Sequence, residues 1–118
     1  MHSLVNLAVP TGAVAIHWFE QSSFALKNPQ GKVALIDPYF PHERPADRFV
    51  HSMPPVDEAT LPADVVFLTH DHLDHTHAET LVRVKASNPA VQMIGPVESI
   101  RRVVAEVGLP EAQTRVVA

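Results

Sequence analysis

Three histidines and two aspartates lie within the six positions from 70 to 75: His70, Asp71, His72, Asp74 and His75. Two carboxylates and several neutral imidazoles gain little from being placed together unless a cation lies among them. Imidazole and carboxylate ligands suit zinc, manganese or iron. The His-x-His spacing also puts alternate side chains of an extended segment on the same side. The cluster therefore predicts a site for a divalent metal ion.

The second half of this cluster can reach a second ion. Asp74 and His75 lie about one turn beyond the His-x-His pair, and two-metal hydrolases hold their ions about 3.5–4 Å apart. We therefore expect four metal ligands, namely His70, His72, Asp74 and His75, and we expect Asp74 also to orient or deprotonate a water molecule. The alternative is a solvated loop that happens to be rich in histidine, and it explains neither the spacing nor the strand before it.

The elements that must position the cluster follow an α/β pattern. The apolar run at 64–69 predicts a strand that is buried on both faces and ends at the cluster. Three short strands are expected before it, at 13–19, 23–27 and 32–37, and a proline-rich loop fills 39–62. A helix at 78–86, a strand at 91–94, a helix at 97–107 capped by Gly108, and the start of a strand at 114–118 follow.

Several other residues receive structural interpretations. The aromatic side chains on the strands are expected in the core: Trp18, Phe19, Phe24 and Phe67. We expect His77 to face solvent at the start of a helix, and Asp71 either to face solvent or to lie behind the ligands. The pair Arg101 and Arg102 is expected on a solvated helix face.

Length and composition fix the broad class. A chain of 118 residues with 46% hydrophobic residues predicts one globular domain spanning 1–118. Lys and Arg number 9 against 13 Asp and Glu, and the sequence has no block of basic residues that could bind a phosphate backbone, so we expect no nucleic-acid partner.

The absence of cysteine excludes thiolate catalysis and Cys-based metal sites. No apolar run reaches about 20 residues, so we expect no membrane association and a cytoplasmic location.

Three segments make the sequence resemble a known family. Residues 69–75 read THDHLDH, which matches the T-H-x-H-x-D-H signature of the metallo-β-lactamase-fold hydrolases at the end of a strand. Residues 36–40, IDPYF, are similar to the first motif of that family, a strand ending in an aspartate. Residues 18–24, WFEQSSF, resemble the W-x-G-x-S-x-F hairpin of the branch that includes L-ascorbate-6-phosphate lactonase, with Glu20 in place of the glycine.

The resemblance implies a fold and a chemistry. It implies half of an αβ/βα sandwich, with a mixed sheet and helices on one face. His70 and His72 would bind one zinc or manganese ion, Asp74 and His75 would bind a second, and Asp37 would hold the histidine loop by hydrogen bonds. The implied reaction is hydrolysis of a lactone or other ester by a metal-bound hydroxide. The implied partner is a small-molecule substrate such as a phosphorylated sugar lactone.

The resemblance covers only the first half of that fold. Family members place a third histidine, a bridging aspartate and a last histidine well downstream, but no histidine follows His77 and no aspartate follows Asp74. Each ion would keep two protein ligands, fewer than the three of most catalytic zinc sites. Two alternatives therefore stand beside the hydrolase. One is a truncated or non-catalytic half-domain that binds metal weakly, and the other is a phosphodiesterase of the same fold.

The half-sandwich also carries an expectation about assembly. Helices would cover one face of the sheet and leave the other apolar face open to water. Soluble monomers seldom expose apolar patches larger than a few hundred Å². We therefore expect either a homodimer or a complex with a separate C-terminal half.

Overall fold

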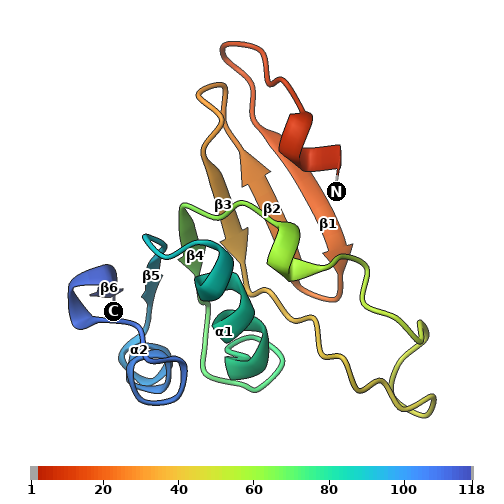
Figure 1. Cartoon of the computed structure of the whole chain (residues 1–118), viewed down its shortest axis with the longest axis vertical. Helices are drawn as coiled ribbons and strands as arrows, with labels where there is room; N and C mark the ends of the chain where they lie inside the picture. The colour runs from red at the N-terminus through yellow and green to blue at the C-terminus, as the bar shows by residue number, and fades with distance from the viewer. Residues whose placement is uncertain (1–2, 118) are drawn as a thin grey trace.

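A computed structural model of the chain describes residues 3–117 (Figure 1). Its centre is one mixed sheet of six strands whose spatial order follows their order in the chain. The strands are β1 (Ala15–Glu20), β2 (Ser23–Lys27), β3 (Val33–Ile36), β4 (Val65–Phe67), β5 (Gln92–Gly95) and β6 (Thr114–Val116). β2 is antiparallel to both of its neighbours, β1 and β3, and β3 to β6 are parallel. The predicted α/β class, with a mixed sheet and helices, is confirmed.

Local turn chemistry explains how the antiparallel strands are joined. The turn between β2 and β3 is closed by Asn28, whose side chain accepts a hydrogen bond from the backbone N–H of Lys32 at 2.8 Å. Gly31 in the same turn has a φ of 82°, which a residue without a Cβ adopts at little cost. These contacts place β2 and β3 side by side, so that the chain after β3 begins at the edge where the metal motif lies.

The parallel strands need longer connections. The segment between β3 and β4 is the predicted proline-rich loop, which in Figure 1 extends beyond the lower ends of β1 to β3 and contains one 3-10 turn, Glu58–Thr60. Helix α1 (Ala78–Ser87) joins β4 to β5. Helix α2 (Val97–Arg102) and the π-helical turn Val103–Val107 join β5 to β6. Gly108, with a φ of 75°, ends this helical segment as predicted.

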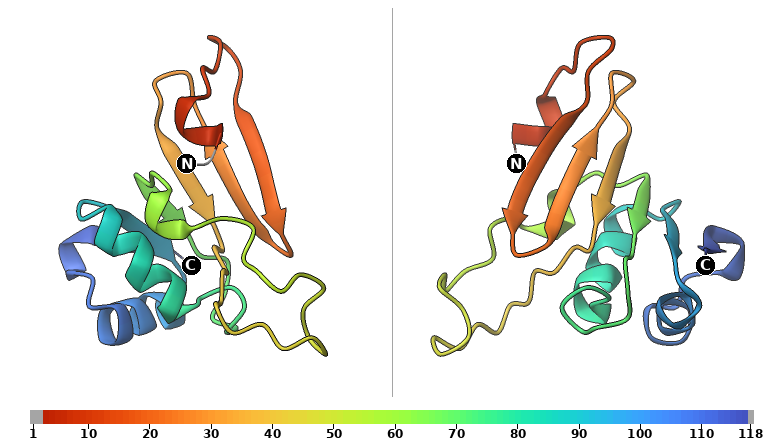
Figure 2. Two further views of the ribbon diagram at one scale, coloured as in Figure 1. Left: turned by 45° about the vertical axis from the view of Figure 1, so that its right-hand side comes forward. Right: turned by 180° about the vertical axis from the view of Figure 1, so that it is seen from behind.

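The core lies between the sheet and the helices. Alternate strand residues are fully buried on this side, among them Leu35 on β3, Val66 on β4 and Met93 on β5. Leu81 and Val84 of α1 belong to the same buried cluster. Figure 2 shows the arrangement from two further directions. Within residues 3–117, no helix combines the length and the apolar character that crossing a membrane requires.

The opposite side of the sheet is apolar but uncovered. Because cross-strand partners share a face, the registers align two rows: Ile16, Leu26, Ala34 and Val65 in one, and Trp18, Phe24, Ile36, Phe67 and Ile94 in the other. These nine residues are called the open sheet face below. Ile16 is 68% exposed, Trp18 60% and Phe67 39%.

The open sheet face corrects two predictions. Trp18, Phe24 and Phe67 lie on this face and are not core residues, although Phe19 is buried. Strand β4 is buried on one face only, because Val66 points into the core while Phe67 lies on the uncovered side. The indole N–H of Trp18 instead donates to the carbonyl of Gln21 at 2.8 Å. The apolar composition of a strand face does not show whether another part of the molecule covers that face.

Candidate metal centre

The candidate site forms where two neighbouring parallel strands end. Asp37 follows β3, and the 69–75 motif follows β4. The backbone N–H of Asp37 donates to the carbonyl of Phe67 at 3.0 Å, which continues the pairing of the two strands beyond their ends. Asp37 has a φ of 44°, a left-handed conformation that aspartate tolerates better than most residues. The two motifs therefore meet at one edge of the sheet.

The carboxylate of Asp37 connects these motifs and is almost fully buried, at 1% exposed. Its Oδ1 accepts from the backbone N–H of Thr69 at 2.8 Å. Its Oδ2 accepts from the Thr69 hydroxyl and lies 2.6 Å from Nδ1 of His75. Ser23 from β2 donates to the carbonyl of Asp37 at 2.7 Å and accepts from the backbone N–H of Tyr39 at 3.0 Å. This network ties the histidine loop to the end of β3.

The hydrogen bonds also select which imidazole nitrogens face outward. The Thr69 hydroxyl has one hydrogen, which it donates to Asp37, so its contact of 2.9 Å with Nδ1 of His70 requires the imidazole to be the donor. His75 likewise donates from Nδ1 to Asp37. In a neutral imidazole the other nitrogen then carries the lone pair. His70 and His75 thus each have Nε2 available as a metal ligand, with Nδ1 held from behind.

The rings of the three motif histidines gather together. The centroids of His70 and His75 are 3.9 Å apart, and those of His70 and His72 are 4.5 Å apart. Ligand atoms of Asp37, His70 and His75 all lie within 4.8 Å of one another. Asp74 is half exposed, and its Oδ2 lies 3.7 Å from Nε2 of His75. All four residues that we predicted as metal ligands are therefore at this one edge of the sheet.

Two threonines support the site in ways that the sequence did not indicate. Thr69 relays a hydrogen bond from His70 to Asp37, as described above. Thr76 is fully buried, donates to the carbonyl of His70 at 2.7 Å and lies 3.0 Å from the hydroxyl of Ser99 on α2. The backbone N–H groups of His75 and Thr76 both donate to the carbonyl of His72, which folds the motif into a tight turn. The only sequence signal was the position of Thr69 inside the motif.

The predictions for Arg102 and His77, two neighbours of the motif, are wrong. Arg102 was expected on a solvated helix face, but its Nε and Nη2 donate to the two carboxylate oxygens of Asp71 at 2.8 and 3.2 Å. This hydrogen bonding lowers the pKa of Asp71. His77 does not face solvent. It is the N-cap of α1, its Nδ1 accepts from the backbone N–H of Thr80, and burial lowers its pKa.

The donor set fits a divalent metal ion. Ligand atoms of Asp37, His70 and His75 converge, the His72 ring packs against His70, and Asp74 lies beside Nε2 of His75. Asp37 and Thr69 bind the Nδ1 atoms of His75 and His70 from behind. Nitrogen and oxygen donors of this kind suit zinc or manganese. A metal bound here would be held by His70, His72, Asp74 and His75, with Asp37 fixing their orientation.

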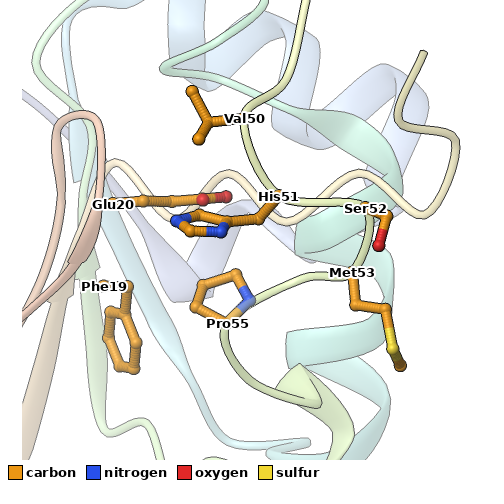
Figure 3. Close-up of a pocket in the computed structure, with 7 residues that line it drawn as sticks. All are labelled: Phe19, Glu20, Val50, His51, Ser52, Met53 and Pro55. Atoms are coloured by element: carbon orange, nitrogen blue, oxygen red, sulfur yellow. The ribbon is translucent and has the colours of Figure 1, made fainter. Parts of the chain in front are cut away.

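A separate cavity of about 560 Å³ lies away from this edge (Figure 3). Phe19 and Glu20 of β1 form one wall, and loop residues 50–53 with Pro55 form the other. It contains no residue of the metal motif, and His51 is exposed there. The other loop histidine, His42, is about half exposed and lies 3.3 Å from a buried oxygen of Glu58.

Comparison with known proteins agrees with this architecture. The chain is 31% identical over 104 residues to a UPF0173 metal-dependent hydrolase of Thermodesulfovibrio yellowstonii, which covers 86% of this chain and 35% of the relative. It is 34% identical over 105 residues to a UPF0173 metal-dependent hydrolase of Polynucleobacter asymbioticus, covering 82% and 34%. The chain therefore spans about a third of the length of these relatives.

A solved structure and a family model complete the comparison. The crystal structure of a protein from Parabacteroides distasonis superposes with a TM-score of 0.59 at 18% identity, covering 88% of this chain and 37% of that one, which shows a shared fold. Residues 15–116 match the model of the β-lactamase superfamily domain. Strands β1 to β6, the Asp37 motif and the histidine motif all lie within this match, and the chain therefore belongs to the β-lactamase superfamily domain family.

Proposed function

We propose that this chain forms the metal-binding half of a hydrolase that opens a lactone or cleaves another ester. The observation that supports this most is the hydrogen-bond pattern of Asp37 and Thr69, which leaves the Nε2 lone pairs of both His70 and His75 free to bind a metal ion, with that of His75 next to Asp74. We propose zinc or manganese as the metal and up to two ions in a complete site. The substrate would be a small molecule, such as a phosphorylated sugar lactone.

The residues of the chain would divide the chemistry among them. When bound, a divalent ion lowers the pKa of water and polarises a carbonyl or phosphoryl oxygen. His70, His72 and His75 would supply nitrogen donors, and Asp37 would keep His75 in one orientation. Asp74 is half exposed and lies next to Nε2 of His75, where its carboxylate can orient a water molecule and accept a proton from it.

The proposal has two rivals. A non-catalytic half-domain would hold the metal weakly, because no histidine follows His77 and no aspartate follows Asp74 to complete the ligand sets. A phosphodiesterase would use the same donors on a different ester. The net charge of −4 makes a nucleic acid the less favourable phosphodiester substrate. The cytoplasmic location stays a prediction.

We also propose that a second copy of this chain covers the open sheet face. The face joins nine apolar positions over five strands, and three of its side chains are more than a third exposed. A two-fold axis lets one self-complementary apolar surface cover another without any further component. A separate C-terminal half is the competing occupant, and relatives about three times as long as the matched segment have enough chain to provide one.

Hydrolysis assays test the enzymatic proposal. A simple lactone and a simple phosphodiester are incubated with the chain and excess Zn²⁺ or Mn²⁺, beside the Asp74→Ala variant. We expect slow, metal-dependent lactone hydrolysis that chelation and Asp74→Ala abolish, because each ion has too few protein ligands for rapid turnover. Faster cleavage of the phosphodiester would favour the phosphodiesterase. Equal rates for the native chain and the variant with both substrates would favour the non-catalytic half-domain.

A further inference from the structure

A second hollow, of about 400 Å³, adjoins the metal centre through Asp74. Its lining includes Gln21 from the β1–β2 turn, Tyr39 after β3, and Glu43, Arg48 and Phe49 from the proline-rich loop. A volume of this order suits a small molecule. The hollow therefore joins the loop, the hairpin turn and the metal motif around one space.

The walls of this hollow are fixed by contacts behind them. The Tyr39 ring packs edge-to-face on His77 with centroids 4.8 Å apart, and its centroid lies 6.3 Å from that of Phe49. Arg44 lies 4.9 Å from the centre of the Phe49 ring and pairs with Glu20 at 2.6 Å. The loop that contributes Arg48 is thus attached to the end of β1.

Two polar groups in the hollow have no partner among residues 3–117. The Arg48 guanidinium forms no ion pair there, whereas Arg44, Arg83 and Arg102 are each paired with a carboxylate. The Tyr39 hydroxyl likewise has no hydrogen bond in that part of the chain, although its backbone N–H is bonded to Ser23. Burial and Asp74 raise the pKa of Tyr39, while Arg44 and Arg48 lower it, so the hydroxyl lies within electrostatic reach of the motif and of both guanidinium groups.

We propose that this hollow holds a single oxyanion group, a carboxylate or a phosphate, of the substrate, with Arg48 as its ion-pair partner and Tyr39 as a hydrogen-bond donor. The proposal rests on the hydrolase function proposed above and names the class of substrate for that site. Arg48 supplies a guanidinium suited to bidentate contact with such a group. Glu43 lines the same hollow and has no ion pair within residues 3–117. Its charge opposes a substrate with several negative groups, so the hollow favours one oxyanion.

The test titrates inorganic phosphate, and separately propionate, into the ¹⁵N-labelled, metal-free chain at pH 8. We expect shifts of the amides of Gln21, Tyr39 and Phe49. Losing a hydrogen bond to a charged group should weaken binding about tenfold in Arg48→Gln. The exposed Arg101→Gln variant is the matched control and should bind like the native chain. The tighter of the two anions identifies the group.

The Glu43→Gln variant should change phosphate affinity in the direction opposite to Arg48→Gln. Removing the repelling carboxylate should tighten phosphate binding, a change that loss of structure cannot produce, and Tyr39→Phe should weaken it less than Arg48→Gln does. Equal affinities in Arg48→Gln and Arg101→Gln, or shifts confined to the histidine motif, would overturn the inference. Zinc binding is measured separately, on aliquots of the same proteins dialysed against Zn²⁺. A chain without zinc would contradict the hydrolase proposal, whereas a zinc-binding chain indifferent to Arg48→Gln would contradict this inference alone.

Discussion

His75 and Asp37 are 38 positions apart in the sequence, yet Nδ1 of the imidazole lies 2.6 Å from Oδ2 of the carboxylate. One residue follows β4 and the other follows β3, and the parallel pairing of these strands brings them together. The contact determines which nitrogen of His75 can bind a metal ion. It also ties the histidine motif to the most buried carboxylate of the site.

Replacing Asp37 by asparagine tests this relationship. Asparagine tolerates the left-handed backbone at φ 44°, but its amide nitrogen cannot accept the proton of Nδ1. Loss of such a supporting contact typically lowers metal affinity about 10- to 100-fold, and we expect that range for Zn²⁺ in Asp37→Asn. Competition with a chromophoric chelator measures the affinity. The exposed Asp47→Asn is the control, and equal affinities in the two variants would contradict the role of Asp37.

The open sheet face predicts self-association. At micromolar concentration, size exclusion with light scattering should give twice the 12.9 kDa chain mass for the native protein. Trp18→Lys places a charge on the β1 side of the face and should give the monomer, because an unpaired charge is costly to bury. Val82→Lys, at an exposed position on α1, is the control and should remain dimeric. A monomeric native chain that unfolds cooperatively would show that no second copy is needed.

The buried carboxylate of Glu58 predicts a strong dependence of stability on Arg83. Glu58 is fully buried, and Arg83 donates to it from α1. Breaking a buried pair leaves an uncompensated charge, which typically costs about 3–5 kcal/mol. We expect Arg83→Met to lower the free energy of unfolding by about that amount in urea titrations, and Arg101→Met to change it little. The double variant Glu58→Leu/Arg83→Met should recover much of the loss, and a double variant as unstable as Arg83→Met would refute the explanation.

Arg83 also makes the stability depend on pH through Glu79. A hydrogen bond from Arg83 holds the pKa of Glu79 below its ordinary value of 4.5. The unfolded chain therefore binds a proton at this site at higher pH than the folded chain does. The resulting stabilisation is fully present above pH 4.5 and is lost as pH falls through the lower pKa of the folded state. In Glu79→Gln, the free energy of unfolding should fall less steeply below pH 4.5 than in Glu98→Gln. If the free energies of unfolding of the two variants fall equally with pH, Glu79 does not contribute this stabilisation.

The sequence predicted the elements and the motif because both are encoded locally. Alternating apolar residues and the turn at Asn28 and Gly31 identify strands, and the spacing from His70 to His75 identifies the metal cluster. The position of each predicted strand was confirmed, with boundaries that shift by at most two residues. The family was also confirmed by the match over 15–116.

The rest depends on contacts between distant segments. The prediction that Trp18, Phe24 and Phe67 lie in the core is wrong, because an apolar residue gives no local sign of whether its face is covered. The pairing of Arg102 with Asp71 joins positions 31 apart and follows from the docking of α2 beside the motif. The hollow around Tyr39 and Arg48 likewise depends on how the proline-rich loop folds back, which no periodicity in that loop encodes.

Metal content is the most direct test of the central claim that the 70–75 cluster is a metal site. The native chain, a His70→Ala/His72→Ala variant and a His42→Ala/His51→Ala control are dialysed against Zn²⁺ or Mn²⁺ and analysed for bound metal. The control loses the same number of imidazoles from the proline-rich loop. We predict bound metal in the native chain and in the control, and little or none in His70→Ala/His72→Ala. Equal metal content in all three proteins would contradict the account.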